Sequence, residues 1–130
     1  MIALDSSAIV AVALGEPEMR DFNALIARHE ALVGTPTLFE TYLVLEQRIP
    51  AAADEFLSSF VDRPSMHPVA FNLPMYQLAQ DAFKAFGKGK GHPAKLNFGD
   101  CMSYAVAKFH DVPLLFKGDD FRLTDIRVAL

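Results

Sequence analysis

Residues 96–110 read LNFGDCMSYAVAKFH, and residues 112–116 follow as VPLLF. In the first stretch, apolar residues recur at the spacing of one helix face: Phe98, Met102, Ala105, Val106 and Phe109. The second stretch is a short apolar run with the length of a buried strand. Asp100 stands in the opening turn of the predicted helix, where an acid favours the helix dipole and can cap free N–H groups. Alternatively, Asp100 belongs to a metal-binding cluster.

The same alternation of apolar runs and helical stretches continues through the chain. Strands are predicted at MIALD (1–5), ALVGT (31–35), HPVAF (67–71) and VPLLF (112–116), with IRVAL (126–130) as an added edge strand. Helices are predicted over 8–14 (capped by Ser6 or Ser7), from Pro17 through 26, over 35–49 and 51–61, from Asn72 through 86, and over 96–110. The segment GKGKGHPAK (87–95) is predicted as a loop.

Apolar strands that alternate with helices favour an α/β fold. We therefore expect a three-layer arrangement, with a mostly parallel central sheet of four to five strands flanked by helices. The 130 residues are expected to form one domain, because no linker or repeat divides them.

Composition limits the classes of protein. A hydrophobic content of 52% with 11 phenylalanines indicates a packed globule, and no apolar run approaches the roughly 20 residues of a membrane span. The single cysteine fits a reducing cytoplasm, where we expect the protein to act. The net charge of −4 argues against nucleic-acid binding by bulk electrostatics. Basic residues nevertheless cluster between Lys84 and Lys95, so a polyanion would be bound locally.

Acidic residues follow or flank several predicted strands. Asp5 ends the first strand, Glu40 lies in the helix after the second, Asp100 opens the helix before the fourth, and Asp119 and Asp120 follow the fourth. Each has an ordinary structural interpretation as a helix cap, a solvated position or a turn residue. Together, they are expected at the carboxyl ends of parallel strands, where sites gather in such sheets. A cluster of carboxylates is tolerated when a divalent cation neutralises it, and oxygen ligands select Mg²⁺ or Mn²⁺.

Four stretches carry a resemblance to a known family: LDSSAIVA (4–11), TPTLFET (35–41), LNFGDCMSYAVAK (96–108) and LLFKGDDFRLTDI (114–126). In this order they resemble the acidic motifs of PIN-domain ribonucleases, and more narrowly the VapC-type toxins of bacterial toxin–antitoxin pairs. The resemblance implies cleavage of RNA with Mg²⁺ or Mn²⁺, a homodimer and inhibition by a cognate antitoxin.

The resemblance also implies site residues. Asp5, Asp100 and Glu40 match the family's acidic trio as catalytic and metal-binding residues. Asp120 matches the fourth acid better than Asp119, because the family often has Asn-Asp-Phe where this chain has Asp119-Asp120-Phe121. Products with a 5′-phosphate and a 3′-hydroxyl are expected.

Further residues are candidates for contact with the substrate. Ser6 stands where the family commonly has threonine and is expected to hydrogen-bond Asp5 or water. Lys88, Lys90 and His92 belong to the glycine-rich segment and are candidate contacts to RNA phosphates; the alternative is a solvated loop with no specific role.

Three other classes of protein remain alternatives. Receiver domains have a pair of acidic residues at the first strand and another acidic residue after a middle strand. This chain has only Asp5 at its first predicted strand and no acidic residue directly after HPVAF. A haloacid-dehalogenase-type phosphatase expects a second aspartate where Ser7 stands. A catalytically silent PIN fold acting as a binding module is disfavoured by the retained acids. Cys101 is expected to pack as a small hydrophobe, and the histidines show no zinc motif.

Overall fold

The computed structural model describes residues 1–130. Its sheet has the strand order β3-β2-β1-β4, and every neighbouring pair is parallel: β1 (Ile2–Leu4), β2 (Ala31–Gly34), β3 (Met66–Val69) and β4 (Leu114–Leu115). The chain builds outward from β1 through β2 to β3 and then crosses to the other side of β1 for β4. The strand order therefore reverses between β1 and β4, which is where open α/β sheets place their sites.

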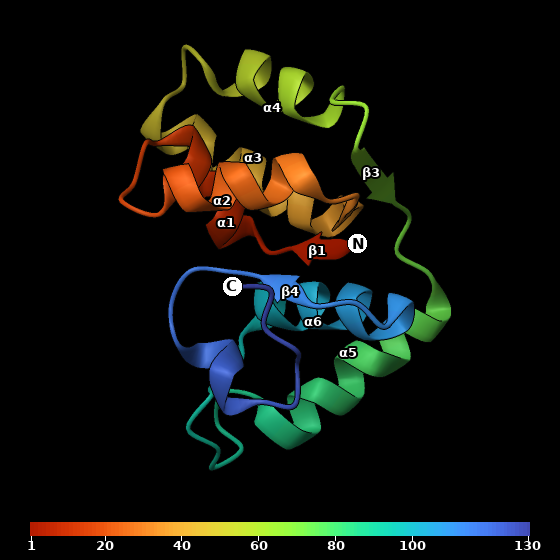
Figure 1. Ribbon diagram of the computed structural model, residues 1–130. Coiled ribbons are helices and arrows are strands. Elements are labelled where there is room, and N and C mark those ends of the chain that lie inside the picture. Colours follow the sequence, from red (N-terminus) through yellow and green to blue (C-terminus); the bar gives the residue numbers. More distant parts are fainter.

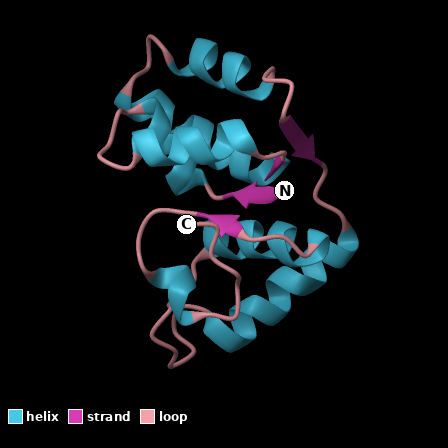
Figure 2. Ribbon diagram, viewed as in Figure 1, coloured by secondary structure: helices cyan, strands magenta, loops and turns pink.

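Helices cover both faces of this sheet (Figures 1 and 2). On one face lie α1 (Ser6–Ala13), α2 (Met19–Arg28) and α4 (Ala53–Val61), and on the other α5 (Leu73–Phe86) and α6 (Phe98–His110). The remaining long helix, α3 (Thr35–Arg48), contacts both α1 and α6. The predicted three-layer α/β fold with a parallel central sheet is confirmed.

Successive side chains of a strand point to opposite faces of the sheet, and the core is accordingly divided into two apolar clusters. Ile2 and Leu4 face the cluster with α1, α2 and α4, whereas Ala3 between them faces the cluster with α5 and α6. All three side chains are at most 4% exposed. A strand buried on both faces reads as a continuous apolar run, which is why so short a segment was recognisable.

Several helix boundaries follow from local signals that the sequence displays. Asn72 accepts a hydrogen bond from the Met75 N–H at 2.9 Å and begins α5, as predicted. Asn97 and Asp100 form a reciprocal capping box at the start of α6. The helix predicted to open at Pro17 instead begins at Met19. The first helix begins at Ser6 and is capped by Asp5 rather than by Ser6 or Ser7.

Two predictions about apolar residues were wrong. The C-terminal segment 126–130 does not form an edge strand; it makes a single bridge between Val128 and Leu114, because β4 has only two residues to pair with. Phe98 and Phe109, placed on the buried face of α6, are 77% and 43% exposed. Because α6 packs against both the sheet and α5, its buried surface is centred on 103–107 instead. None of the helices combines the length and the apolar character that a membrane span requires.

Candidate acidic active site

Asp5 lies where β1 ends, and its side chain is only 4% exposed. One carboxylate oxygen accepts hydrogen bonds from the N–H and the hydroxyl of Ser7, at 3.1 and 2.6 Å. The other accepts a hydrogen bond from the Ser103 hydroxyl at 2.5 Å. The helix-cap interpretation of Asp5 is therefore correct, and Asp5 also occupies the predicted position at the carboxyl edge of the sheet.

Glu40 lies on α3 and is half-buried against the start of α6. Burial raises the pKa of its carboxyl above 4.5, the neighbouring Ser6 side chain opposes this rise, and the charge of Asp5 adds to it. A Cβ at Gly99 would overlap the Glu40 carboxylate, so the missing side chain of Gly99 makes room for this acid. Ser6 thus lies beside Glu40, whereas the hydroxyl that donates to Asp5 belongs to Ser7. The contact with Asp5 predicted for Ser6 is therefore wrong, and its alternative contact with water stays a prediction.

Asp100 stands in the first turn of α6 and accepts a hydrogen bond from the Asn97 N–H at 3.0 Å. Burial raises the pKa of its carboxyl to about 6; this hydrogen bond opposes the rise, and the charges of Asp5, Asp120 and Glu40 add to it. The four carboxylates are therefore close enough for Asp100 to respond to the other three. Four segments that are distant in sequence bring acids to one region of the fold.

Asp119 and Asp120 follow β4, and Asp120 begins a short 3-10 helix, η1 (Asp120–Leu123). Both side chains are exposed. The charge of Asp120 is one of those that raise the pKa of Asp100, and the charge of Asp119 is not. Asp119 instead lines a polar hollow with Glu18, Lys117 and Arg122.

The donor set fits a hard divalent cation in its chemistry, because carboxylate oxygens are the ligands Mg²⁺ and Mn²⁺ prefer. The charges of Asp5, Asp120 and Glu40 add to the rise that burial causes in the pKa of Asp100, and a cation would relieve this repulsion. As the side chains stand, however, no three histidine, cysteine, aspartate or glutamate residues are arranged to hold one metal ion between them. The ligand set of Asp5, Glu40, Asp100 and Asp120 therefore stays a prediction.

Ser103 was not among the predicted site residues, and Ser7 rather than Ser6 donates to Asp5. Ser103 is 1% exposed and lies three residues after Asp100, on the same side of α6. A serine within an apolar helix carries no distinctive spacing signal. Only its partner, 98 positions away in the sequence, reveals its role. Cys101 is buried as predicted, and burial raises the pKa of its thiol to about 11, so it is no nucleophile.

The glycine-rich segment 87–95 is closed at its base, where the Lys88 N–H donates to the Leu96 carbonyl at 2.9 Å. His92 is half-buried; its Nδ1 accepts from the Ala94 N–H at 3.0 Å, and its ring packs edge-on against Phe86. The Lys90 ammonium lies 5.5 Å from the centre of the Phe83 ring. The segment leads directly into α6 and is drawn toward the same end of the molecule as η1 (Figure 1).

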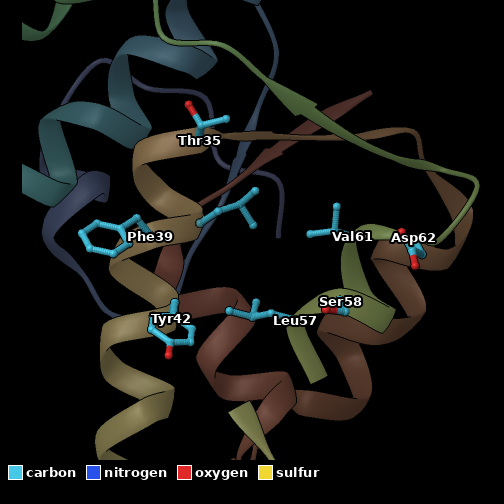
Figure 3. A pocket seen from close by; sticks show the side chains of 8 residues that line it. Thr35, Phe39, Tyr42, Leu57, Ser58, Val61 and Asp62 are labelled. Carbon is cyan, nitrogen blue, oxygen red and sulfur yellow. The ribbon is translucent and has the colours of Figure 1, made fainter. Parts of the chain in front are cut away.

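The largest hollow lies apart from the acids, between α3 and α4 (Figure 3). It measures about 590 Å³ and is lined mostly by apolar residues, with Tyr42, Leu57 and Val61 among them. Two further apolar grooves meet at the N-terminal part of α6, and Phe98 and Met102 line both. One of these grooves also includes Glu40 and Gly99, so apolar surface borders the acidic site.

Comparison with known proteins identifies the family. The family model described as PIN domain matches residues 2–126. VapC ribonuclease Mb0640 of Mycobacterium bovis is 40% identical over 126 residues, covering 96% of this chain and 95% of the relative. Ribonuclease VapC of Mycolicibacterium smegmatis is 37% identical over 126 residues, covering 96% and 97%.

Solved structures share the fold. VapC20 of Mycobacterium tuberculosis, described as a sarcin–ricin loop cleaving toxin, has a TM-score of 0.78 at 17% identity and covers 100% of this chain and 98% of that one. VapBC2 of Rickettsia felis, bound to a DNA fragment from its promoter, has a TM-score of 0.77 at 14% identity and covers 98% and 97%. With this fold and with relatives at 37–40% identity over nearly the whole chain, the chain belongs to the PIN-domain family and, within it, to the VapC ribonucleases, the toxins of toxin–antitoxin systems.

Proposed function

We propose that this ribonuclease, a single PIN domain over residues 1–130, hydrolyses RNA phosphodiester bonds in the cytoplasm with a Mg²⁺ or Mn²⁺ ion bound by Asp5, Glu40, Asp100 and Asp120. The observation that carries the proposal is the convergence of acids from separate elements: Asp5 is buried where β1 ends, and a Cβ at Gly99, next to Asp100 on α6, would overlap the Glu40 carboxylate of α3. The charges of Asp5, Asp120 and Glu40 also add to the rise that burial causes in the pKa of Asp100. Carboxylates that repel one another favour the binding of a cation between them.

A divalent ion bound there would supply the positive charge that activates water and offsets the charge developing on the phosphate. Asp5, which is buried, and Asp100, at the start of α6, are the proposed direct ligands. Glu40 and Asp120 would hold surrounding waters or a second ion that arrives with the RNA. Asp119 is the weaker candidate for the fourth acid, because its charge is not among those that act on Asp100.

RNA is a polyanion, so an acidic site requires nearby cations to admit it. Lys88, Lys90 and His92 are proposed as contacts to RNA phosphates, because their segment leads directly into the helix that carries Asp100. With Nδ1 accepting from a backbone N–H, a neutral His92 carries its proton on Nε2 and can donate it to a phosphate oxygen. Ser6 remains a candidate substrate contact beside Glu40.

Two protein partners are proposed. A second copy of the chain would cover the exposed apolar residues around α6, which are Phe39, Leu43, Tyr76, Phe83 and Phe98. A cognate antitoxin is supported by neighbours of the same fold solved as toxin–antitoxin assemblies, among them one from Klebsiella pneumoniae with a TM-score of 0.67 at 14% identity. The apolar groove between α3 and α4 suits an amphipathic helix of such a partner (Figure 3).

The experiment compares RNA cleavage by the wild type, Asp5→Asn and Asp54→Asn, with Mg²⁺, Mn²⁺ or a chelator, and sequences the 5′ ends produced. Asp54 is an exposed acid on α4 and serves as the control. We expect discrete cuts with 5′-phosphates from the wild type and the control, a loss of roughly 100-fold or more in Asp5→Asn, and no cuts with chelator. Equal cleavage by Asp5→Asn would remove the acidic site from the reaction. Absence of cuts from the wild type would instead favour a catalytically silent binding module.

A further inference from the structure

Buried hydroxyl groups connect the segments that carry the acids. Ser103 of α6 donates to one oxygen of Asp5 at 2.5 Å, and its own oxygen lies 3.4 Å from the hydroxyl of Thr37 on α3. Thr37 and Ser103 are each 1% exposed. On the other side of Asp5, the Ser7 hydroxyl donates at 2.6 Å and accepts the Lys117 N–H at 2.9 Å.

The direction of these hydrogen bonds follows from counting protons. A serine hydroxyl has one proton, and Ser103 directs it to Asp5, so Thr37 must be the donor in its contact with Ser103. The proton of Ser7 is likewise directed to Asp5, while its oxygen accepts from Lys117. Two chains of donors therefore end on Asp5, one from α3 through α6 and the other from the segment after β4.

Counting hydrogen bonds also shows how many lone pairs of the Asp5 carboxylate remain free. A carboxylate offers about four lone-pair directions, and the Ser7 N–H, the Ser7 hydroxyl and the Ser103 hydroxyl occupy three of them. Roughly one direction is left for any other partner. An acid held on both oxygens from two helices has its rotamer fixed, and groups that orient a ligand in this way strongly affect metal affinity.

The network also reaches the other acids through their helices. Thr37 precedes Glu40 by three residues on α3, and Ser103 follows Asp100 by three on α6, so each hydroxyl shares a helix face with an acid. The Lys117 N–H belongs to the segment that carries Asp119 and Asp120. Through Ser103 and Ser7, Asp5 is therefore linked to the other acid-bearing segments.

We propose that Ser103 is a positioning residue of the acidic site: with Thr37 behind it, its hydroxyl fixes the carboxylate of Asp5 relative to Glu40 and Asp100 and thereby sets the affinity for a divalent ion. This inference rests on the proposed function, since it assumes that Asp5 binds that ion. It assigns a role to a buried hydroxyl on α6, in addition to the four acids.

The test measures binding of Mn²⁺ alone to the purified chain, by calorimetry and by the electron spin resonance signal of free Mn²⁺. Ser103→Ala is expected to weaken binding by roughly 10-fold or more, and Thr37→Val to weaken it less. Thr41→Val is the matched control, because the Thr41 hydroxyl is equally buried on the same helix but donates only to the Thr37 carbonyl, at 2.7 Å. The control is expected to stay within about twofold of the wild type.

Folding is monitored by circular dichroism, and Ser103→Cys, which keeps a similar volume but offers only a weak donor, carries the test if Ser103→Ala does not fold. In cleavage assays the Ser103 variants are expected to lose kcat with little change in KM for RNA, because a side chain that is 1% exposed does not itself contact RNA. Unchanged Mn²⁺ affinity in folded Ser103 variants, with binding lost in Asp5→Asn, would overturn the positioning role and leave the proposed function intact. Absence of Mn²⁺ binding in the wild type would overturn both.

Discussion

Asp100 illustrates how one residue serves a structural and a chemical role together. Its carboxylate completes a capping box with Asn97, which is the ordinary interpretation of an acid in the first turn. Its pKa is also raised to about 6 by burial and, beyond that, by the charges of Asp5, Asp120 and Glu40. Capping alone would favour the charged form, so the net rise reflects burial and the neighbouring acids.

A pH prediction follows from this raised pKa. Because folding raises the pKa of Asp100 from 3.8 to about 6, its protonated form stabilises the fold fully below pH 3.8, and this contribution is lost as the pH rises through about 6. The side chain of Asp100→Asn is neutral at every pH. With chelator present, the free energy of unfolding of this variant is therefore expected to rise relative to that of the wild type by about 1–3 kcal/mol as the pH increases from 4 to 7.

Thermal unfolding of both proteins across that pH range measures the difference. Asn at this position can still accept the Asn97 N–H, so the cap is preserved in the comparison. A difference in Tm between the two proteins that does not vary with pH would show that folding does not raise the pKa of Asp100. Saturating Mg²⁺ is expected to reverse the order at pH 7, since the cation then stabilises the wild type.

At the scale of elements, the close approach of α3 and α6 forms the site. Gly99 is buried at the start of α6, and a Cβ there would overlap the carboxylate of Glu40. That carboxylate is the end of a flexible side chain, so a small substitution would displace the acid rather than separate the helices.

Gly99→Ala is therefore expected to reduce RNA cleavage roughly as much as Glu40→Gln does while leaving Tm unchanged or slightly raised, because alanine favours a helix over glycine by up to about 1 kcal/mol. Cleavage rates and thermal unfolding of the two variants provide the comparison. Wild-type activity in Gly99→Ala would mean that the position of Glu40 against this glycine has no part in catalysis.

The glycine-rich segment 87–95 supports a prediction about RNA binding. Replacing Lys88 and Lys90 by glutamate is expected to weaken RNA affinity and to reduce the slope of log affinity against log salt by about 1 to 1.5, as for two lost phosphate contacts to a single strand. Arg48→Glu, which alters an exposed arginine on the last turn of α3, is the control. Equal slopes in the wild type and the double variant would exclude this segment from the interface.

The sequence predicted most elements because their signals are local. Apolar runs bounded by turn residues marked β1 and β2, and the Asn72 cap marked α5. The prediction of the buried face of α6 was wrong because that face depends on which elements pack against the helix, and the local sequence does not contain this information. The contact of Ser103 with Asp5 was not predictable for the same reason. Asp5, Glu40 and Asp100 were candidates because they flank predicted strands and match the family's acidic motifs.

For the whole molecule, exposed apolar surface beside the acids bears on assembly. Phe98, the most exposed large apolar side chain at 77%, lines two grooves that together extend from α3 to α5. Apolar surface that continues across three helices marks an interface more often than a free face. Its position next to Glu40 would bring the acidic sites of two copies near their shared boundary.

Phe98→Glu is expected to convert a dimer into a monomer, because two charges would be buried at the centre of the contact. Light scattering after size exclusion measures the mass at micromolar concentration. Leu73→Glu, which alters a side chain 68% exposed outside both grooves, should leave the mass of the assembly unchanged. A wild type that is already monomeric would contradict the proposed homodimer.

The claim that four carboxylates share one cation is tested most directly by crystals of the wild type soaked in Mn²⁺ and measured near the manganese absorption edge. The account predicts an anomalous peak bounded by Asp5, Glu40, Asp100 and Asp120, which disappears in Asp5→Asn. A fully occupied peak elsewhere on the chain, or none at millimolar Mn²⁺ and pH 7.5, would contradict it.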